Sequence, residues 1–304
     1  MLSVEMYTER WEYQMVVIEN QYLSVMISPQ GGTLQSVRSK ENNIEYLWQG
    51  DRAYWGGRAP NLFPFVGRLY QEQYSYNGKC YPMKCHGFLG KKELIPEQTG
   101  PDSCAFILTD SPETLEIYPF RFTLRLEYRL EGRQIHICFR VRNTGENTMY
   151  CGFGGHPGFN IPLEEGLCFE DYAVSFPTNC QVNVVDFSQG VLTRGKKPYP
   201  LEAGRFLHLD HNLFHHDAVV FADCPREVTL TSSKGKHGVI ARFPDMPYVG
   251  FWQVRDKDAP YLCIEPWSVC PGREGVIEDI ATMADMTAIK AGETAVNCWN
   301  IEIF

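Results

Sequence analysis

The clearest pattern in this chain is a strict alternation of apolar and polar residues near its middle. Apolar side chains take every second position from Phe122 to Leu130, and the alternation resumes from Ile135 to Val141 after a Glu131-Gly132 turn. A period of two is typical of a β-strand with one buried face. The stretch therefore predicts a long antiparallel hairpin.

Shorter strands are predicted along the rest of the chain, separated by turn residues. Two of them, at 15–18 and 22–27, flank an Asn20-Gln21 turn, and a hairpin at 74–84 turns at Asn77-Gly78. A short helix is expected from Ser111, because a serine cap there precedes a proline in the first turn. The remaining predicted strands span residues 34–37, 218–221, 228–231, 239–243, 249–254, 261–264 and 294–304.

The chain lacks the amphipathic helices of about 12 residues or more that a helical or α/β protein would show. Turn signals instead recur about every 8 to 12 residues, which is typical of a sandwich or barrel. Residues 48–70 follow no period and form a long loop, residues 194–197 (RGKK) are a short charged turn, and we find no linker. We therefore predict a single all-β domain over residues 1–304.

Composition and charge exclude several classes of protein. With 44% hydrophobic and 21% charged residues, the chain can bury a large core and is not disordered. A net charge of −9 argues against nucleic acid as a partner. No run approaches the ~18 apolar residues of a membrane span. The first five residues lack the basic region and apolar run of a signal peptide, so we expect none.

The cysteines indicate a reducing compartment. There are eleven of them, an odd number, with no C-x-x-C spacing, and the chain has no N-x-[ST] glycosylation site. A secreted disulfide scaffold would show a different pattern. We therefore expect reduced thiols and a cytoplasmic protein.

Residues 154–160 (GGHPGFN) are the strongest candidate for a functional loop. Glycine permits unusual backbone angles and proline fixes them, so His156 is held by a stiff bend. Imidazole gives or takes a proton near neutral pH more readily than other side chains. The alternative interpretation is a core histidine with a local hydrogen bond.

A second candidate lies at the expected end of strand 261–264. Glu265 follows this strand and is itself followed by Pro266 and Trp267. An indole face can stack on a pyranose ring, and a partly buried glutamate has its pKa raised towards that of a useful base. The alternative is a glutamate in a structural salt bridge.

Three further stretches carry polar residues between strands. Arg68, in a loop rich in proline and phenylalanine, could hold a substrate hydroxyl or carboxylate, or form a structural ion pair. His86 precedes a glycine and a phenylalanine, and the alternative is again a core histidine. His215 and His216 point opposite ways on an extended segment, which favours a surface pair, whereas Asp217 after them can face a pocket.

Several familiar chemistries have no support in the sequence. It contains no G-x-x-x-x-G-K-[ST], H-E-x-x-H or G-x-S-x-G motif. The glycines at 152–155 are followed by Pro157 and by no helix, unlike those of a dinucleotide-binding loop. We therefore expect neither a metal nor a cofactor.

Taken together and in this order, these stretches resemble the aldose 1-epimerase (galactose mutarotase) superfamily. The resemblance is greatest to a bacterial branch of mutarotase-like proteins, some of them encoded with lactose-utilisation genes. It covers nearly the whole chain from about residue 15. The matching segments are 61–68 (N-x-F-P-x-x-G-R-like), 86–88 (H-G-F), 154–159 (G-x-H-P-x-F) and 264–267 (I-E-P-W).

This resemblance implies a large antiparallel β-supersandwich and an isomerase that opens an aldose ring and recloses it at either face of C1. By position, Glu265 would be the base that takes the C1 hydroxyl proton. His156 would be the acid that protonates the ring oxygen. Arg68 and His86 would position the sugar, and Asp217 would bind its hydroxyls.

One departure from the family concerns the substrate. Relatives often have an arginine shortly after H-G-F, where this chain reads Leu89-Gly90. Arg58, Arg68 and Arg273 are the arginines near the matched segments, and at most one of Lys91 and Lys92 would face inward, so we expect a free aldohexose of the galactose or glucose type. The alternatives are a hexose-6-phosphate 1-epimerase and a non-catalytic carbohydrate-binding protein. Both a monomer and a homodimer remain open.

Overall fold

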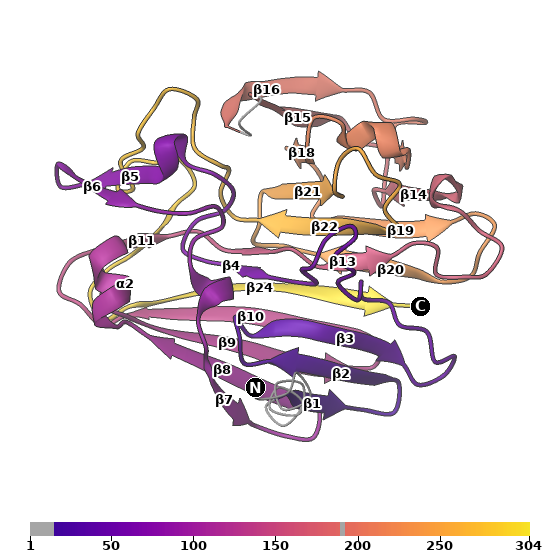
Figure 1. Ribbon diagram of the computed structural model, residues 1–304, viewed down its shortest axis with the longest axis horizontal. Coiled ribbons are helices and arrows are strands. Elements are labelled where there is room, and N and C mark those ends of the chain that lie inside the picture. Colours follow the sequence, from indigo (N-terminus) through magenta and orange to yellow (C-terminus); the bar gives the residue numbers. More distant parts are fainter. Residues whose placement is uncertain (1–14, 189–191) are drawn as a thin grey trace, which may run out of the picture.

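The computed structural model describes residues 15–188 and 192–304, which form an almost entirely β-stranded protein (Figure 1). The all-β fold class is thus confirmed. The first five residues, on which the expectation about a signal peptide rested, lie outside these ranges. Within them, no helix has the length and apolar character to cross a membrane.

The larger of two extended sheets has nine antiparallel strands. The predicted central hairpin lies inside it as β9 (Phe122–Glu131) and β10 (Gln134–Asn143), with Leu130 opposite Ile135. The order across the sheet is β17 (Phe206–His208), β14 (Tyr172–Ser175), β19 (Glu227–Ser232), β20 (Gly238–Arg242), β24 (Thr294–Ile303), β10, β9, β8 (Ser103–Thr109) and β7 (Ile95–Gln98).

The second large sheet has eight strands. Its order is β16 (Thr193–Tyr199), β15 (Val182–Phe187), β18 (Val219–Ala222), β21 (Tyr248–Trp252), β22 (Tyr261–Trp267), β12 (Gly154–Gly155) and β4 (Asn61–Leu62), and β13 (Gly158–Asn160) also pairs with β22. In Figure 1 its strands β16, β15, β18, β21 and β22 lie above β24, β10, β9 and β8 of the nine-stranded sheet, whereas β14 and β19 of that sheet lie on the right at the height of β21 and β22.

Smaller elements surround the two sheets. The predicted helix is α2 (Pro112–Ile117), and the Ser111 side chain caps it by accepting a hydrogen bond from the Thr114 backbone N–H. The other elements are the sheet β1 (Val16–Glu19), β2 (Leu23–Ser28) and β3 (Thr33–Ser39), the hairpin β5 (Gln73–Tyr76) and β6 (Lys79–Pro82), the pair β11 (Met149–Cys151) and β23 (Thr287–Ile289), and the 3₁₀ turns η1 (Tyr70–Glu72), η2 (Leu89–Lys91), η3 (Phe169–Asp171) and η4 (His211–Phe214).

The main core lies between the two large sheets. Leu126 and Phe139 enter it from the nine-stranded sheet, and Phe251 and Ile264 enter it from the eight-stranded sheet. Successive side chains on a strand point to opposite faces. Glu265, next to Ile264, therefore lies on the other face of its sheet, directed away from this core.

Two predictions from the sequence are wrong, one about a turn and one about the end of a strand. Residues 194–197 do not form a turn but belong to β16, which pairs with β15 and is the edge strand of its sheet. Charged side chains are common on such edge strands because solvent reaches them. Strand β22 also continues through Pro266 to Trp267, so Glu265 lies inside the strand and not at its end.

The expectation of reduced thiols is wrong for two of the eleven cysteines. Cys138 on β10 and Cys298 on β24 are directly paired across the strands and form a disulfide, with Cα atoms 4.2 Å apart. They are 160 residues apart in the sequence. Their pairing follows from the strand order, which spacing alone does not reveal. The other nine cysteines are free.

Candidate active site

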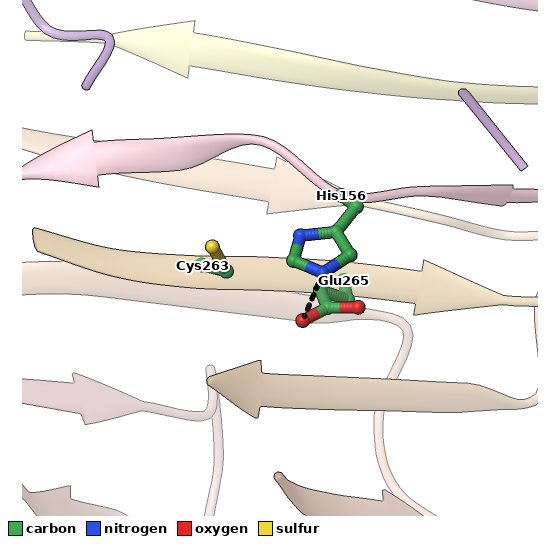
Figure 2. Close-up of side chains that lie close together, drawn as sticks. All are labelled: His156, Cys263 and Glu265. Carbon is green, nitrogen blue, oxygen red and sulfur yellow. Dashed lines mark ion pairs between the residues drawn. The ribbon is translucent and has the colours of Figure 1, made fainter. Parts of the chain in front are cut away.

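The site forms beside strand β22, where the segment that pairs with β22 is divided into two short strands, β12 and β13. β12 pairs with one end of β22 and β13 with the other, which leaves residues 156–157 opposite Glu265. The Pro157 carbonyl still accepts a hydrogen bond of 3.1 Å from the Ile264 backbone N–H. The bend is thus anchored to the strand, and His156 projects from it towards Glu265 (Figure 2).

The bend requires a glycine at position 155. The ring of Trp299, which comes from β24 of the other sheet, lies directly beneath it. A Cβ atom on residue 155 would stand only 2.4 Å from this ring. Glycine alone permits this approach, so the two sheets together fix the position of His156.

His156 and Glu265 form a buried pair of titratable groups. His156 Nε2 lies 3.3 Å from Glu265 Oε1, and the residues are only 8% and 1% exposed. Burial raises the pKa of Glu265 well above 4.5, and the nearby Asp217 charge raises it further. Burial, with His86 nearby, lowers the pKa of His156 well below 6.5. The carboxylate is therefore a strengthened base and the imidazolium a strengthened acid.

Two tryptophans enclose the His156 imidazole. Trp55 stacks on it with ring centroids 5.0 Å apart and an interplanar angle of 26°, and Trp252 meets it edge-on at 5.5 Å. These rings keep water from the imidazole and fix its orientation. The sequence analysis missed both residues, although the aromatic loop at 48–70 was a signal for Trp55.

His86 is held in one tautomer by the backbone. Its Nδ1 accepts a hydrogen bond of 3.1 Å from the Gly67 N–H, so in the neutral ring Nε2 carries the proton. Burial, together with the Arg68 charge, lowers the pKa of His86 to about 4. At neutral pH His86 is therefore an uncharged hydrogen-bond donor, with its ring 5.4 Å from that of His156.

All six residues that the sequence analysis selected line one pocket of about 260 Å³. They are Arg68, His86, His156, Asp217, Glu265 and Trp267, and they come from five separate stretches of the chain. The other lining residues are Trp55, Pro60, Gly67, Cys85, Ala218, Trp252 and Pro271. A pocket of this size suits a small molecule.

Arg68 and Asp217 form the more accessible part of the pocket. Arg68 is exposed and has no salt-bridge partner within the ranges that the structure describes, so it is not a structural ion pair. Asp217 has a φ of 104°, a conformation that side chains rarely adopt and that often marks functional positions. His215 and His216 are exposed, as predicted, but they form a turn after η4 and not the extended segment that was expected.

Two other arginines considered from the sequence do not line this pocket. The Arg58 guanidinium donates to the Gln35 carbonyl oxygen at 2.6 Å. Arg273 makes two hydrogen bonds to the Glu278 carboxylate, at 2.8 and 2.9 Å. Both guanidinium groups are thus occupied by other parts of the chain.

The pair has one further neighbour that could ligate a metal. Cys263 lies two residues before Glu265 on β22, and the ligand atoms of Cys263, Glu265 and His156 all lie within 4.8 Å of one another (Figure 2). A metal needs deprotonated thiolate and carboxylate ligands. Without a metal, burial and the nearby Glu265 raise the pKa of the Cys263 thiol well above 9. Cys263 is also not among the residues that line the pocket. We assign no metal to them.

The fold and the pocket define an all-β protein with a buried carboxyl–imidazole pair in a hollow of small-molecule size. Residues 14–279 match the model of the family described as aldose 1-epimerase, and the chain belongs to this family.

Its relatives include proteins of Lactococcus and Lactobacillus species. The chromosomal and plasmid forms of Protein LacX from Lactococcus lactis subsp. lactis are each 36% identical over 262 residues, which cover 83% of this chain and 87% of each relative. A galactose mutarotase related enzyme from Lactobacillus acidophilus is 31% identical with a TM-score of 0.90, covering 95% of this chain and 97% of that one. A galactose mutarotase-like protein from Lactobacillus casei is 30% identical with a TM-score of 0.90, covering 95% and 100%. The predicted family and fold are confirmed.

Proposed function

We propose that this protein is an aldose 1-epimerase that interconverts the α- and β-anomers of a free aldohexose. The observation that carries the proposal is the 3.3 Å separation of His156 Nε2 and Glu265 Oε1 inside the pocket. Ring opening removes a proton from the C1 hydroxyl and delivers one to the ring oxygen. Both oxygens are bonded to C1, so the base and the acid must lie close together.

In this mechanism Glu265 takes the proton of the C1 hydroxyl while His156 protonates the ring oxygen, and the C1–ring oxygen bond breaks. The aldehyde then rotates, and the reverse transfers close the ring on its other face. General acid–base groups typically contribute ~10²–10⁴-fold each. The raised pKa of Glu265 makes its carboxylate a stronger base and the lowered pKa of His156 makes its imidazolium a stronger acid, while both shifts reduce the populations of these charged forms.

The other lining residues supply groups that suit a polyhydroxyl ligand. His86 Nε2–H and the Arg68 guanidinium are donors, and the Asp217 carboxylate is an acceptor. Trp267 offers an indole against which a pyranose ring can pack. Together they would hold the sugar so that C1 meets the reactive pair.

The test is a polarimetric trace of freshly dissolved α-glucose and α-galactose with and without the protein. We expect a faster approach to equilibrium that scales with protein concentration. A rate equal to that of buffer alone would reject the epimerase. If the tryptophan fluorescence still responded to the sugar, the non-catalytic carbohydrate-binding alternative would be supported instead.

A further inference from the structure

The indole N–H of Trp267 is a buried hydrogen-bond donor to which the acid–base mechanism assigns no role. Trp267 is 3% exposed and lines the pocket of His156 and Glu265. Its Nε1 atom has no hydrogen-bond partner among residues 15–188 and 192–304. Buried donors are nearly always paired in native proteins, because an unpaired donor destabilises the fold. The reason for this donor is therefore to be sought in the site.

Trp267 and Glu265 point to the same face of their sheet. They are two positions apart on β22, and alternate side chains of a strand share a face. Both side chains line the pocket, which lies on this face. The indole is thus a direct neighbour of the carboxyl group.

Two glycines show how the indole lies on this face. A Cβ atom on Gly154 of β12 would stand 3.2 Å from Trp267 Cδ1, and one on Gly250 of β21 would stand 3.3 Å from Trp267 Cζ2. Cδ1 and Cζ2 are the two ends of the indole edge that carries Nε1. Gly154 is directly paired with Trp267, whereas Gly250 is directly paired with Glu265. The N–H edge therefore runs obliquely over β22, from the position of Trp267 towards that of Glu265.

The Trp267 side chain also acts on the charge of Glu265. Burial, followed by the Asp217 charge, raises the pKa of Glu265, whereas hydrogen bonding by Trp267 lowers it. The contact is not an aligned hydrogen bond, since Nε1 remains unpaired. Hydrogen bonds in active sites often become shorter and better aligned when the substrate binds. The N–H is thus placed to pair with the carboxylate during the reaction.

We propose that Trp267 is a positioning residue that holds the ionised Glu265 carboxylate through its indole N–H, while its ring packs against the sugar. The inference rests on the proposed function, in which this carboxylate is the base. A donor to a carboxylate stabilises the charged form. The N–H therefore keeps part of the Glu265 population ionised in a site whose burial opposes ionisation.

The other titratable and charged groups around Glu265 are unchanged when Trp267 is replaced. On β22 itself they are Tyr261 and Cys263. From other segments they are Arg68, Cys85, His86, His156 and Asp217. Trp267→Phe keeps an aromatic face towards the sugar and removes the N–H. Its effect on the ionisation of Glu265 therefore reports the contribution of the N–H.

The ionisation of Glu265 is measured by a difference infrared titration from about pH 5 to about pH 9. The band of its protonated carboxyl group is identified as the one that Glu265→Gln removes. We expect the midpoint of this band to lie ~1 pH unit or more higher in Trp267→Phe than in the wild type, because a hydrogen bond to a charged group contributes that much.

The matched control is Trp48→Phe. Trp48 is also buried and donates its Nε1–H to the Trp55 carbonyl oxygen at 2.8 Å, but it does not line the pocket. This variant loses an indole N–H of the same kind elsewhere, so the midpoint of Glu265 should stay in place.

Polarimetry on the same variants measures the consequence for the reaction. At neutral pH, Trp267→Phe should lower kcat by ~3- to 10-fold, because an about tenfold smaller ionised population is partly offset by the greater basicity of the carboxylate. The KM for glucose should change little, since the phenyl ring still packs against the sugar. A role in packing alone would raise KM and leave the infrared midpoint unchanged.

The inference is overturned by a midpoint that Trp267→Phe leaves in place or that both tryptophan variants move alike. A moved midpoint with an unchanged kcat also overturns it. A wild-type Glu265 that stays protonated up to about pH 9 does so as well, because no carboxylate would then be held. If Trp267→Phe does not fold, benzothienylalanine incorporated at position 267 replaces the N–H by sulfur at nearly the same volume, and the same shifts are expected.

Failure of the proposed function can be told apart from failure of this inference, because the infrared titration needs no substrate. A wild type without mutarotase activity whose midpoint still moves in Trp267→Phe would reject the epimerase and keep the contact between Trp267 and Glu265. A wild type that mutarotates, with a midpoint that does not move in Trp267→Phe, would reject the role of Trp267 alone.

Discussion

At the scale of single residues, the buried Glu265 is the proposed base and also affects the stability of the fold. Its pKa in the folded protein lies above the unfolded value of 4.5, so its ionised form destabilises the fold. The penalty is absent below about pH 4.5 and grows as the pH rises towards the folded-state pKa. The proposed base therefore weakens the protein near neutral pH, a trade-off that is common at active sites.

We predict that Glu265→Gln lowers the mutarotation rate by ~10²-fold or more while raising the melting temperature at pH 7.5. Glutamine keeps the shape of the side chain but carries neither the basic oxygen nor the buried charge. Polarimetry and calorimetry at pH 4.5 and 7.5 measure both effects, and the gap in melting temperature should close at the lower pH. If more than about a tenth of the rate remained, Glu265 would not be the base.

Substitutions of the two histidines in the pocket should change different kinetic constants. His156 is 3.3 Å from Glu265, whereas the Nδ1 of His86 is engaged by the Gly67 backbone. We predict that His156→Ala lowers kcat at least as much as His86→Ala, and that His86→Ala acts more through KM. Steady-state kinetics on both variants decides this. A larger loss of kcat in His86→Ala would mean that the two roles are reversed.

At the scale of elements, the disulfide ties together two strands that are remote in the sequence. Cys138 on β10 and Cys298 on β24 close a loop of 160 residues. Cross-links over long loops restrict the unfolded chain and typically contribute ~2–5 kcal/mol. We predict that Cys298→Ser lowers the melting temperature, whereas Cys80→Ser, at an exposed free thiol, does not.

A thiol titration of the unfolded, unreduced protein checks the same feature. Nine of the eleven cysteines should react, and eleven after reduction. Eleven reactive thiols before reduction, together with equal melting temperatures for the two variants, would show that the pair is not oxidised in solution.

Local patterns predicted some elements well and others poorly. The hairpin β9–β10 and the helix α2 were found because their signals, alternation and a serine cap, lie within a few residues of one another. Strand β8 was missed because Cys104, Ala105 and Phe106 are all buried, so its apolar residues are consecutive and do not alternate with polar ones. The edge strand β16 was mistaken for a turn because its exposed charges resemble those of a loop.

The difference between local signals and signals that depend on strand pairing applies to the site as well. Its six predicted residues lie in motifs that can be read within a few positions of the sequence. Trp252 reaches His156 only through the pairing of β21 with β22, and Trp55 only through the course of an irregular loop.

At the scale of the whole molecule, charge should decide between free and phosphorylated sugars. The net charge is −9, Arg58 and Arg273 are occupied elsewhere, and Arg68 is the only cationic Arg or Lys among the residues that line the described pocket. A dianionic sugar would be repelled at long range and held by a single guanidinium. We predict a higher kcat/KM for galactose or glucose than for glucose 6-phosphate.

The comparison should be made at two salt concentrations, because salt screens long-range electrostatics. The disadvantage of the phosphate ester should shrink as salt is added. A preference for glucose 6-phosphate that weakens with salt would instead favour the hexose-6-phosphate epimerase.

The position of β24 has a consequence for how the protein is made. This strand, residues 294–303, lies in the middle of the nine-stranded sheet between β10 and β20, and its Trp299 underlies the bend that carries His156 (Figure 1). When every earlier strand has left the ribosome but β24 has not, the facing edges of β10 and β20 are still unpaired. Unpaired edges of this kind readily pair with other chains. The time needed to translate these residues is therefore an interval in which the nascent protein is exposed to aggregation and the bend that carries His156 has no support.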